Sequence, residues 1–425
     1  MGEWKMTALG EVADVIMGLS PKGDTYNQKK DGIPLLNGPT EFGPYHPHAI
    51  LYTTDPARFA EPGDLLFCVR GSTTGRMNWA DRQYAIGRGI AAIRAKTNGK
   101  DTFFAYCCIC DSMKRLLSFT SGSVFPNLST GDINAFEIPW PEESVRTCIA
   151  HILGTLDDKI ELNRRMNRTL EKMAAALFKS WFIDFDPVHA KADGRDTGLP
   201  AEIADLFPDS FDDSDLGPIP KGWKANPLPE LIKINPKRTL AKGTPSPFLE
   251  MSNMPTRGPS PDAWRLREMG SGMKFVNGDT LVARITPCLE NGKTAFVDFL
   301  ADGEVGWGST EYIVLRPLGD IPPVFAYLLA RTSDFRNFAI QQMTGSSGRQ
   351  RVPADSLTKY SIVGPDIHSP IFRAFGQLVS PLFRRISAAS RQSRNLSRMR
   401  DALLPKLMSG EIEMPVAETG ERRSK

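Results

Sequence analysis

Two segments of the chain approach a catalytic motif, and neither completes one. The segment ENGKT, which ends at Thr294, resembles the end of a phosphate-binding loop, GxxxxGK[ST]. The first glycine of that loop would fall at Pro287, whose fixed φ and missing N–H are unsuited to a cradle of backbone donors. An adenine methyltransferase would carry an Asn-Pro-Pro-aromatic motif, but the Asn-Pro pairs at Asn226 and Asn235 lack the second proline and the aromatic ring. Neither activity is therefore expected of this chain.

Residues that could bind a catalytic metal are also incompletely grouped. Asp262 and Glu268 could form a metal-binding pair, but Gly270 stands where an acid-x-Lys nuclease motif would place its lysine. His46 and His48 offer only two ligands, in a Pro-rich loop. We expect no metal site and no catalytic centre in this polypeptide.

Cysteine usage and hydropathy indicate a cytoplasmic protein. Cys107 and Cys110 form a CxxC pair, but no second pair or histidine lies at zinc spacing, so buried structural thiols are expected. The N-terminal run lacks the basic start and apolar core of a signal peptide. No apolar run approaches the ~20 residues that span a bilayer.

Charge is distributed unevenly along the 425 residues. Between Ile183 and Gly222, ten acidic residues stand against three basic ones, a net charge of −7, although the whole chain carries +3. The remainder of the chain is therefore basic. A basic body with a segregated acidic connector favours a polyanionic partner.

The chain contains an internal repeat, which predicts the elements that would position these residues. Residues from Phe375 onward align without a gap with the stretch that starts at Ile149. Both stretches place apolar residues at i, i+3/i+4 and i+7, which predicts two long helices with one apolar stripe each. The positions predicted to pair the helices or to dock partner subunits are Ile149, Ile152, Leu156, Ile160, Leu170, Met173 and Leu177 in the first copy, and Phe375, Leu378, Leu382, Ile386, Leu396, Met399 and Leu403 in the second.

The segments before these helices repeat more faintly. PGDLLFCVRG, from Pro62, and NGDTLVARIT, from Asn277, each place a Gly-Asp turn before an apolar strand that delivers an arginine, Arg70 or Arg284. Each continues to an amphipathic helix, a Gly/Ser loop and a short strand that ends at proline. The two globular regions are therefore predicted to be α+β.

One apolar stripe on so long a helix needs a partner. The natural partner is the second copy, in an antiparallel coiled coil with a globular domain at either end. Asn163 interrupts the stripe near its middle. This asparagine either lies in the seam and fixes the pairing register, as buried polar residues do in coiled coils, or simply faces solvent.

The runs LEKMAAALFKSWFIDFDPV and RDALLPKLMSGEI, which close the two helices, resemble the specificity (S) subunits of type I restriction-modification systems. The overall plan resembles that family over nearly the whole chain. The resemblance implies a non-catalytic subunit that binds double-stranded DNA, in which each target-recognition domain reads one half of a bipartite, asymmetric target. It also implies that the paired helices set the spacing and dock two methyltransferase (M) subunits. Endonuclease/translocase (R) subunits would join the full complex, and S-adenosylmethionine, ATP and Mg would bind the partner subunits.

Mapped onto this chain, the family plan predicts six regions. These are a first target-recognition domain (1–141), a first long spacer helix (142–183), an acidic linker (184–220), a second target-recognition domain (221–368), a second long spacer helix (369–411) and a polar tail (412–425).

Candidate DNA-contacting residues lie where glycines permit close backbone approach and arginines suit guanine or phosphate. They are Arg70, Ser72, Thr73, Arg76, Arg82 and Arg88 in the first domain, and Arg284, Asn291, Lys293, Arg349, Gln350 and Arg351 in the second. For any one of them, the alternative is a solvated loop charge or a salt-bridge partner.

Two further alternatives stay open on the sequence alone. The basic face of the second helix, formed by Arg384, Arg391, Arg394 and Arg398, suits partner subunits, phosphates or plain solvent. The rival to DNA recognition is a coiled-coil scaffold whose globular ends bind protein.

Overall fold

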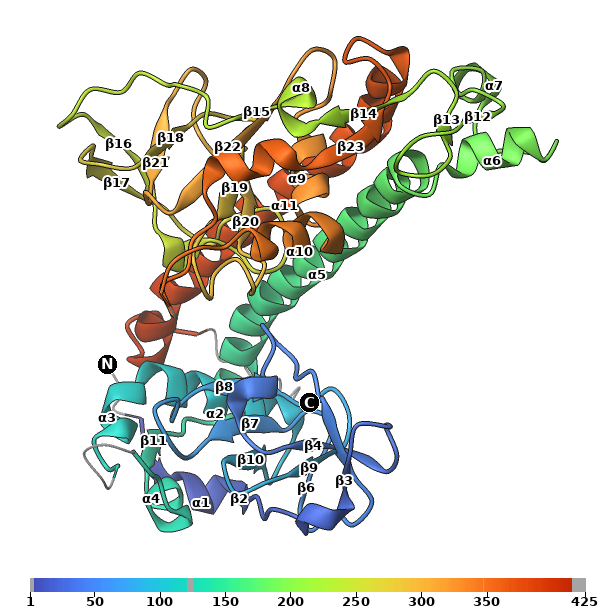
Figure 1. Ribbon diagram of the computed structural model, residues 1–425. Helices are drawn as coiled ribbons and strands as arrows, with labels where there is room; N and C mark the ends of the chain where they lie inside the picture. The colour runs from blue at the N-terminus through green and yellow to red at the C-terminus, as the bar shows by residue number, and fades with distance from the viewer. Residues whose placement is uncertain (1–3, 121–125, 347, 415–425) are drawn as a thin grey trace, which may run out of the picture. The chain divides into compact units, whose positions relative to one another are not determined.

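The computed structural model describes residues 4–120, 126–346 and 348–414, and the chain divides into two compact units. The first unit comprises Met1–Glu161 and Asn395–Lys425, and the second comprises Leu162–Arg394. The two long helices, α5 (Glu143–Phe182) and α11 (Pro370–Met408), contribute residues to both units (Figure 1). Residues 415–425 of the predicted polar tail lie outside the described residues.

The first unit is built from three small sheets and short helices. Its strands are β1 (Met6–Ala8), β2 (Ala13–Met17), β3 (Tyr26–Asn27), β4 (Ile33–Leu36), β5 (Leu51–Thr53), β6 (Phe59–Ala60), β7 (Leu65–Cys68), β8 (Met77–Trp79), β9 (Tyr84–Ile86), β10 (Ile90–Ala95) and β11 (Glu137–Pro139). Its helices before α5 are α1 (Leu9–Val12), α2 (Gly99–Asp111), α3 (Met113–Leu117) and α4 (Thr130–Asn134), with 3-10 turns at Gly23–Thr25 and Pro39–Glu41. The sheet orders are β1-β11, β2-β10-β7-β8 and β3-β5-β4-β9-β6.

The second unit repeats this construction. Its strands are β12 (Phe211–Asp212), β13 (Ile219–Pro220), β14 (Lys224–Pro227), β15 (Ile232–Ile234), β16 (Pro245–Leu249), β17 (Arg265–Glu268), β18 (Met273–Phe275), β19 (Thr280–Ala283), β20 (Thr294–Phe296), β21 (Gly306–Gly308), β22 (Tyr312–Pro317) and β23 (Ser361–Gly364). Its shorter helices are α6 (Asp186–Ala192), α7 (Ala201–Ala204), α8 (Leu228–Leu231), α9 (Val324–Ala330) and α10 (Ser333–Gln341), with 3-10 turns at Met251–Asn253 and Ala354–Lys359. The sheet orders are β12-β13, β14-β23, β15-β22-β19-β20 and β17-β16-β21-β18.

The two units share their topology as well as their composition. The sheet β2-β10-β7-β8 corresponds to β15-β22-β19-β20, and the pair β1-β11 corresponds to β14-β23. In each third sheet one pair of strands is parallel, β4 with β9 and β16 with β21, and the remaining pairs are antiparallel. The predicted α+β class and internal repeat are confirmed.

Local signals place the helices at the observed positions. Asn98 caps α2 by accepting a hydrogen bond from the Asp101 backbone, and Thr332 caps α10 in the same way. The long helix α5 begins two residues after Pro141, and α11 begins at Pro370, where a proline needs no hydrogen-bonded N–H. Both long helices are continuous, although α5 contains Gly154 and α11 contains Gly376, Pro381 and Pro405.

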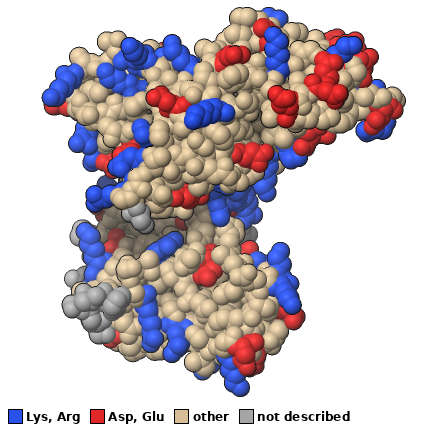
Figure 2. Space-filling model, viewed as in Figure 1, with Lys and Arg blue, Asp and Glu red and all other residues tan. Residues whose placement is uncertain are grey.

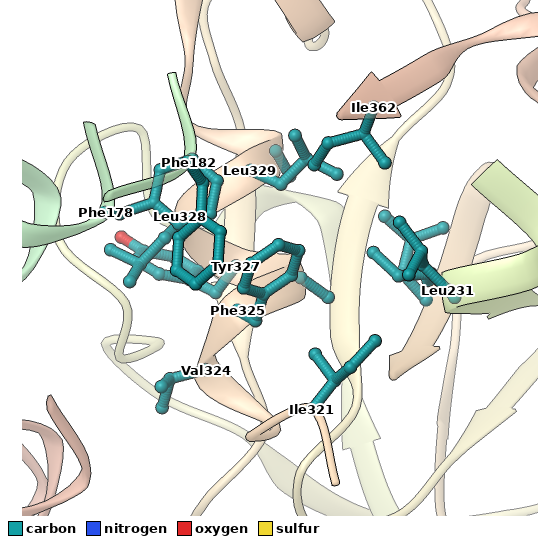
Figure 3. Packing of buried hydrophobic residues seen from close by; sticks show 14 of the residues in the cluster. Phe178, Phe182, Leu231, Ile321, Val324, Phe325, Tyr327, Leu328, Leu329 and Ile362 are labelled. Carbon is teal, nitrogen blue, oxygen red and sulfur yellow. The ribbon is translucent and has the colours of Figure 1, made fainter. Parts of the chain in front are cut away.

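The core of the second unit joins the end of α5 to the helix α9. Figure 3 shows Phe178 and Phe182 of α5 facing Phe325 and Tyr327 of α9. The ring centroid of Phe325 lies 5.0 Å from that of Phe178 and 5.1 Å from that of Phe182. The first unit has a separate core, in which Leu407 and Met408 of α11 pack with residues of α2. Each unit therefore buries part of both long helices in its own core.

The acidic segment is folded, which corrects the expectation of a linker over 184–220. It forms α6, α7 and the pair β12-β13, and its Val188 and Phe207 are buried in the core of the second unit. The ring of Phe207 lies 4.9 Å from that of Trp181 in α5. A few apolar residues scattered among many acids are enough to anchor the segment, and they left no periodic signal in the sequence.

Candidate nucleic-acid interface

The same buried turn supports the strand before each predicted DNA-contacting loop. In the first unit, the Asp64 carboxylate accepts from Arg94 Nε at 2.6 Å and from the Glu61 backbone at 2.8 Å. Gly63 precedes it with a φ of 87°, a conformation that favours glycine. The turn and its ion pair fix the start of β7, which leads to Arg70.

The second unit repeats this turn atom for atom. Asp279 contacts Arg316 Nε at 2.8 Å and accepts from the Val276 backbone at 2.8 Å, and Gly278 again has a φ of 87°. Burial raises the pKa of Asp279, although Arg316 and Arg238 lower it in part. The Gly-Asp motif was recognised in the sequence, but its arginine partners were not.

The strand arginines do not occupy equivalent positions, which corrects the parallel drawn from the sequence. The Val69 carbonyl accepts from the Leu128 N–H at 3.0 Å, and the Arg284 carbonyl accepts from the Val352 N–H at 2.8 Å. Arg284 therefore takes the place of Val69, and not that of Arg70. Because side chains alternate along a strand, this offset of one residue reverses the direction of the arginine.

The environments of the two arginines follow from that offset. Arg70 is exposed, and its Nε donates to Asn127 Oδ1 at 3.1 Å. Arg284 is half-buried, and its Nε is buried with no hydrogen-bond partner among the described residues. Arg70 is thus placed to contact a ligand from solvent, whereas part of the Arg284 side chain is buried inside the unit.

The other candidates of the first unit lie in two adjoining turns. Ser72, Thr73 and Arg76 follow β7, and Arg88 lies in the turn whose Gly89 carbonyl accepts from the Val69 backbone at 3.0 Å. Ser72, Arg76 and Arg88 are exposed, and Thr73 is half-buried.

Arg82 is engaged within the first unit. Its Nε donates to the Tyr84 hydroxyl at 3.4 Å, and its guanidinium lies 5.5 Å from the Tyr84 ring centroid. This hydrogen bond raises the pKa of Arg82. Its assignment as a DNA contact remains a prediction.

In the second unit, the candidate residues come from two loops that are hydrogen-bonded to each other. The Thr286 N–H donates to the Gln350 carbonyl at 3.0 Å, which joins the loop after β19 to the loop before residue 352. Asn291 and Arg349 are exposed on these loops, and the Gln350 side chain is half-buried.

Lys293 and Arg351 have partners inside the second unit. Lys293 Nζ donates to the Met251 carbonyl at 2.5 Å, and Arg351 Nε lies 2.8 Å from Glu311 Oε1. These two residues act at least in part as local supports, which is the salt-bridge alternative that the sequence left open. Asn291 and Arg349 are the more exposed of the predicted residues in this unit.

The helix seam is polar where the predicted stripe fades. Asn163 is 1% exposed, and its Nδ2 donates to Gln392 Oε1 at 2.9 Å and to Ser393 Oγ at 3.2 Å in α11. Asn167 Nδ2 donates to Ser390 Oγ at 3.0 Å. Asn163 therefore lies in the seam, and the solvent-facing alternative is excluded.

Most of the predicted pairing positions are buried or half-buried, with two exceptions. Ile149, Ile160, Phe375 and Ile386 are buried, and Ile152, Leu156, Leu170, Leu177, Leu378, Leu382, Leu396 and Leu403 are half-buried. Met173 and Met399 are 50% and 53% exposed, so they are not seam residues. The strict 226-residue repeat carried them into the set, but the helices turn them outward. Their role in docking partner subunits remains a prediction.

Ionic contacts across the helix pair were missed by the search for an apolar stripe. In the first unit, Arg400 of α11 lies 2.7 Å from the buried Asp157 of α5. The pKa of Tyr106 in α2 is raised by burial and by the neighbouring Cys110 and Asp157. In the second unit, the equivalent tyrosine, Tyr327 of α9, donates its hydroxyl to Glu171 of α5. The Phe-Ala-Tyr triplet that α2 and α9 share is the feature of the sequence that relates the two tyrosines.

Part of the basic face of α11 is used inside the second unit. The Arg394 guanidinium lies 4.7 Å from the Trp264 ring centroid. Burial raises the pKa of Asp298, and a hydrogen bond with Ser387 and the charges of Arg394 and Arg391 oppose that rise. Arg384 and Arg398 are exposed.

Within the described ranges, no group of three or more His, Cys, Asp or Glu side chains could hold a metal ion. Among the same residues, no helix is long and apolar enough to cross a membrane.

Comparison with known proteins places this architecture. Residues 1–172 match the family model of the type I restriction modification DNA specificity domain. A putative type I restriction enzyme MjaX specificity subunit from Methanocaldococcus jannaschii is 32% identical over 172 residues, which cover 40% of each chain. The type I restriction enzyme HindI specificity subunit from Haemophilus influenzae is 23% identical over 82% of this chain and 86% of that protein. By these matches, the first 172 residues are similar to the DNA specificity domain of type I restriction-modification systems.

The fold of the whole chain also resembles that of a solved structure. It is similar to that of a type I restriction-modification system S subunit from M. genitalium, with a TM-score of 0.57 at 16% identity, over 95% of this chain and 96% of that one.

Proposed function

We propose that this chain is the specificity subunit of a type I restriction-modification complex and that it reads a bipartite, asymmetric DNA target, with one unit for each half. The observation that carries the proposal is the duplication: two units share the sheet order and the buried Gly-Asp turn, yet differ in the residues around it. Arg284 replaces Val69, and Arg351 replaces Asn127. A shared scaffold with unlike surfaces suits two unlike half-sites.

The chemistry of the two surfaces supports contact with a duplex. Exposed arginines in the first unit (Arg70, Arg76 and Arg88) and exposed polar residues in the second (Asn291 and Arg349) suit phosphates and base edges. Phosphate contacts would supply most of the affinity, and base contacts would supply the sequence preference.

The paired helices are proposed to set the spacing between the half-sites and to dock the partner subunits. We propose two M subunits, with R subunits added in the full complex. S-adenosylmethionine, ATP and Mg would bind those partners, and the complex would work in the cytoplasm. The exposed methionines Met173 and Met399, at equivalent places on α5 and α11, support docking at two related positions.

Selection from a random duplex library tests the proposal. The chain is purified with its M subunits and incubated with the library at about 50 mM and about 200 mM salt. Two unlike enriched blocks separated by a spacer of fixed length are expected, with much weaker retention at the higher salt. A lack of enrichment over background would refute DNA reading, and a protein retained in place of DNA would support the scaffold alternative.

A further inference from the structure

The strand β17 of the second unit is exposed at every position. Its sequence, RLRE, places Leu266 between Arg265 and Arg267, and the Leu266 side chain is 73% exposed. A single exposed leucine is common on protein surfaces, so exposure alone says little. The setting of Leu266 is what distinguishes it.

Although its side chains are exposed, β17 is held firmly at both ends. Directly before it, the Trp264 ring lies 4.7 Å from the Arg394 guanidinium of α11 and 4.3 Å from the Phe299 ring. Within the strand, the Arg267 guanidinium lies 4.7 Å from the Phe248 ring centroid, and the Arg267 carbonyl accepts from Trp307 Nε1 at 3.3 Å. Leu266 is therefore presented from a fixed backbone that is anchored to a spacer helix, which suits recognition better than a mobile loop does.

One edge of β17 is open. The sheet order β17-β16-β21-β18 leaves β17 at its end, whereas the corresponding strand of the first unit, β5, is covered by β3. Among the described residues, no strand covers β17. By strand register, the residue of the first unit at the place of Leu266 is Tyr52, which is half-buried.

The region around β17 is basic. Between residues 237 and 274, seven basic residues stand against three acidic ones. Figure 2 shows Lys and Arg over the end of the second unit that carries β16, β17 and β18, and acidic residues over the end that carries α6 and α7. This charge favours a polyanion at β17 and disfavours one at α6 and α7.

We propose that β17 is a base-reading element of the second unit, and that Leu266 contacts the methyl group of a thymine in the major groove. The major groove accepts strands as well as helices, and the thymine C5-methyl is its one apolar feature. Arg265, which pairs with Glu250, and Arg267 lie on the opposite face of the strand from Leu266, and they add positive charge to this edge of the sheet. This inference rests on the proposed function, since it names the residues that read one half-site.

The test compares three forms of the chain in complex with M subunits: wild type, Leu266→Ala and Leu216→Ala. Leu216 is the matched control, because it is a 59% exposed leucine of the same unit in the acidic segment. Each complex selects from the random duplex library. Leu266→Ala should lose the preference for thymine at one position of one block and keep the other block, and Leu216→Ala should keep both.

Replacing that thymine by deoxyuridine removes only the methyl group. Wild type should bind the uracil duplex about fourfold more weakly, as expected for one buried methyl-sized group, and Leu266→Ala should not discriminate. If wild type selects two blocks and Leu266→Ala selects the same two, the inference is overturned and the proposed function stands. If wild type selects nothing, the proposed function itself fails. If the Leu266→Ala complex loses a bound protein but keeps an unchanged consensus, the inference about β17 is also overturned. In that case β17 contacts a protein partner.

Discussion

Much of the structural similarity between the two units comes from equivalent contacts of single side chains. Asp64 and Asp279 each occupy the same turn, accept a backbone hydrogen bond of 2.8 Å and hold an arginine from the neighbouring strand. The Gly-Asp dipeptide is visible in the sequence, because a left-handed turn favours glycine. The arginine partners lie 30 or more residues away, and no local pattern connects them.

The candidate contacts were predictable as a region more than as individual residues. Arg70, Arg76 and Arg349 are exposed as expected, because arginines beside glycines in turns usually face solvent. Arg351 and Lys293 look the same in the sequence, but Glu311 and the Met251 carbonyl, both distant in the chain, engage them. Leu266 was not predicted, because an exposed leucine in a strand carries no sequence signal.

A buried ion pair gives the first unit a defined response to acid. Arg146 Nε and Nη2 donate to the Asp101 carboxylate at 2.8 and 3.0 Å. Burial by itself would raise the pKa of Asp101, but the hydrogen bonds from Arg146 and Thr97 and the charge of Arg146 outweigh it and hold the pKa below its ordinary 3.8. The stabilisation is therefore present above pH 3.8 and is lost as pH falls through the lower, folded-state pKa.

Substitution Asp101→Asn tests this response. At pH 7 the variant leaves the buried Arg146 charge without a counter-ion from residue 101, and the free energy of unfolding should fall by about 3 kcal/mol. The difference from wild type should begin to shrink as the pH drops below about 3.8, and should vanish below the lower folded-state pKa, where the folded wild-type carboxyl is neutral too. Urea denaturation at several pH values measures it. A difference that stays constant or widens in acid would contradict the account.

At the scale of elements, the long helices were the most predictable part. The expected ranges 142–183 and 369–411 compare with Glu143–Phe182 and Pro370–Met408, because an apolar period sustained over many turns defines a helix well even where single polar residues interrupt it. The small sheets were not predictable in detail. Their strands are as short as two residues, and the parallel pairing of β4 with β9 joins segments separated by about fifty residues, whose register no local pattern sets.

The helix pair is fixed by polar contacts as well as by apolar ones. Asn163 joins α11 through Gln392 and Ser393, and Arg400 reaches Asp157. Buried polar contacts of this kind favour one register over others. The sequence indicated Asn163, whose position interrupts the stripe, but not Asp157, which resembles any charged residue on a helix.

Removing Arg400 should show how much this ion pair matters. Asp157 is 4% exposed, so Arg400→Ala removes the arginine from a buried carboxylate and should lower the free energy of unfolding by about 3–5 kcal/mol. The double variant Asp157→Ala/Arg400→Ala should lose less than Arg400→Ala alone. Urea denaturation of the full chain, followed by circular dichroism, gives both values.

The exposed pair Lys406–Glu411 on the same helix end provides the control. Lys406→Ala should cost less than about 1 kcal/mol, as solvated ion pairs do. Equal losses for Arg400→Ala and Lys406→Ala would show that the buried pair has no special role.

At the scale of the whole molecule, the duplication was visible in the sequence and the charge distribution was partly so. The plan of globular region, long helix, globular region and long helix follows from periodicity. The structure adds that the three sheets of the first unit each have a counterpart in the second, which carries β12-β13 in addition. The acidic segment was identified by composition, but its fold was not, because Val188 and Phe207 anchor it without any period.

The central claim is that the two units read their half-sites independently. Two variants test it most directly, both in complex with M subunits: Arg70→Ala/Arg76→Ala/Arg88→Ala in the first unit and Asn291→Ala/Arg349→Ala in the second. Selection from the random duplex library should show that each variant weakens or changes one block of the target, a different block in each case, and leaves the other block and the spacer length as in wild type. A variant that alters both blocks together, or two variants that alter the same block, would contradict the account.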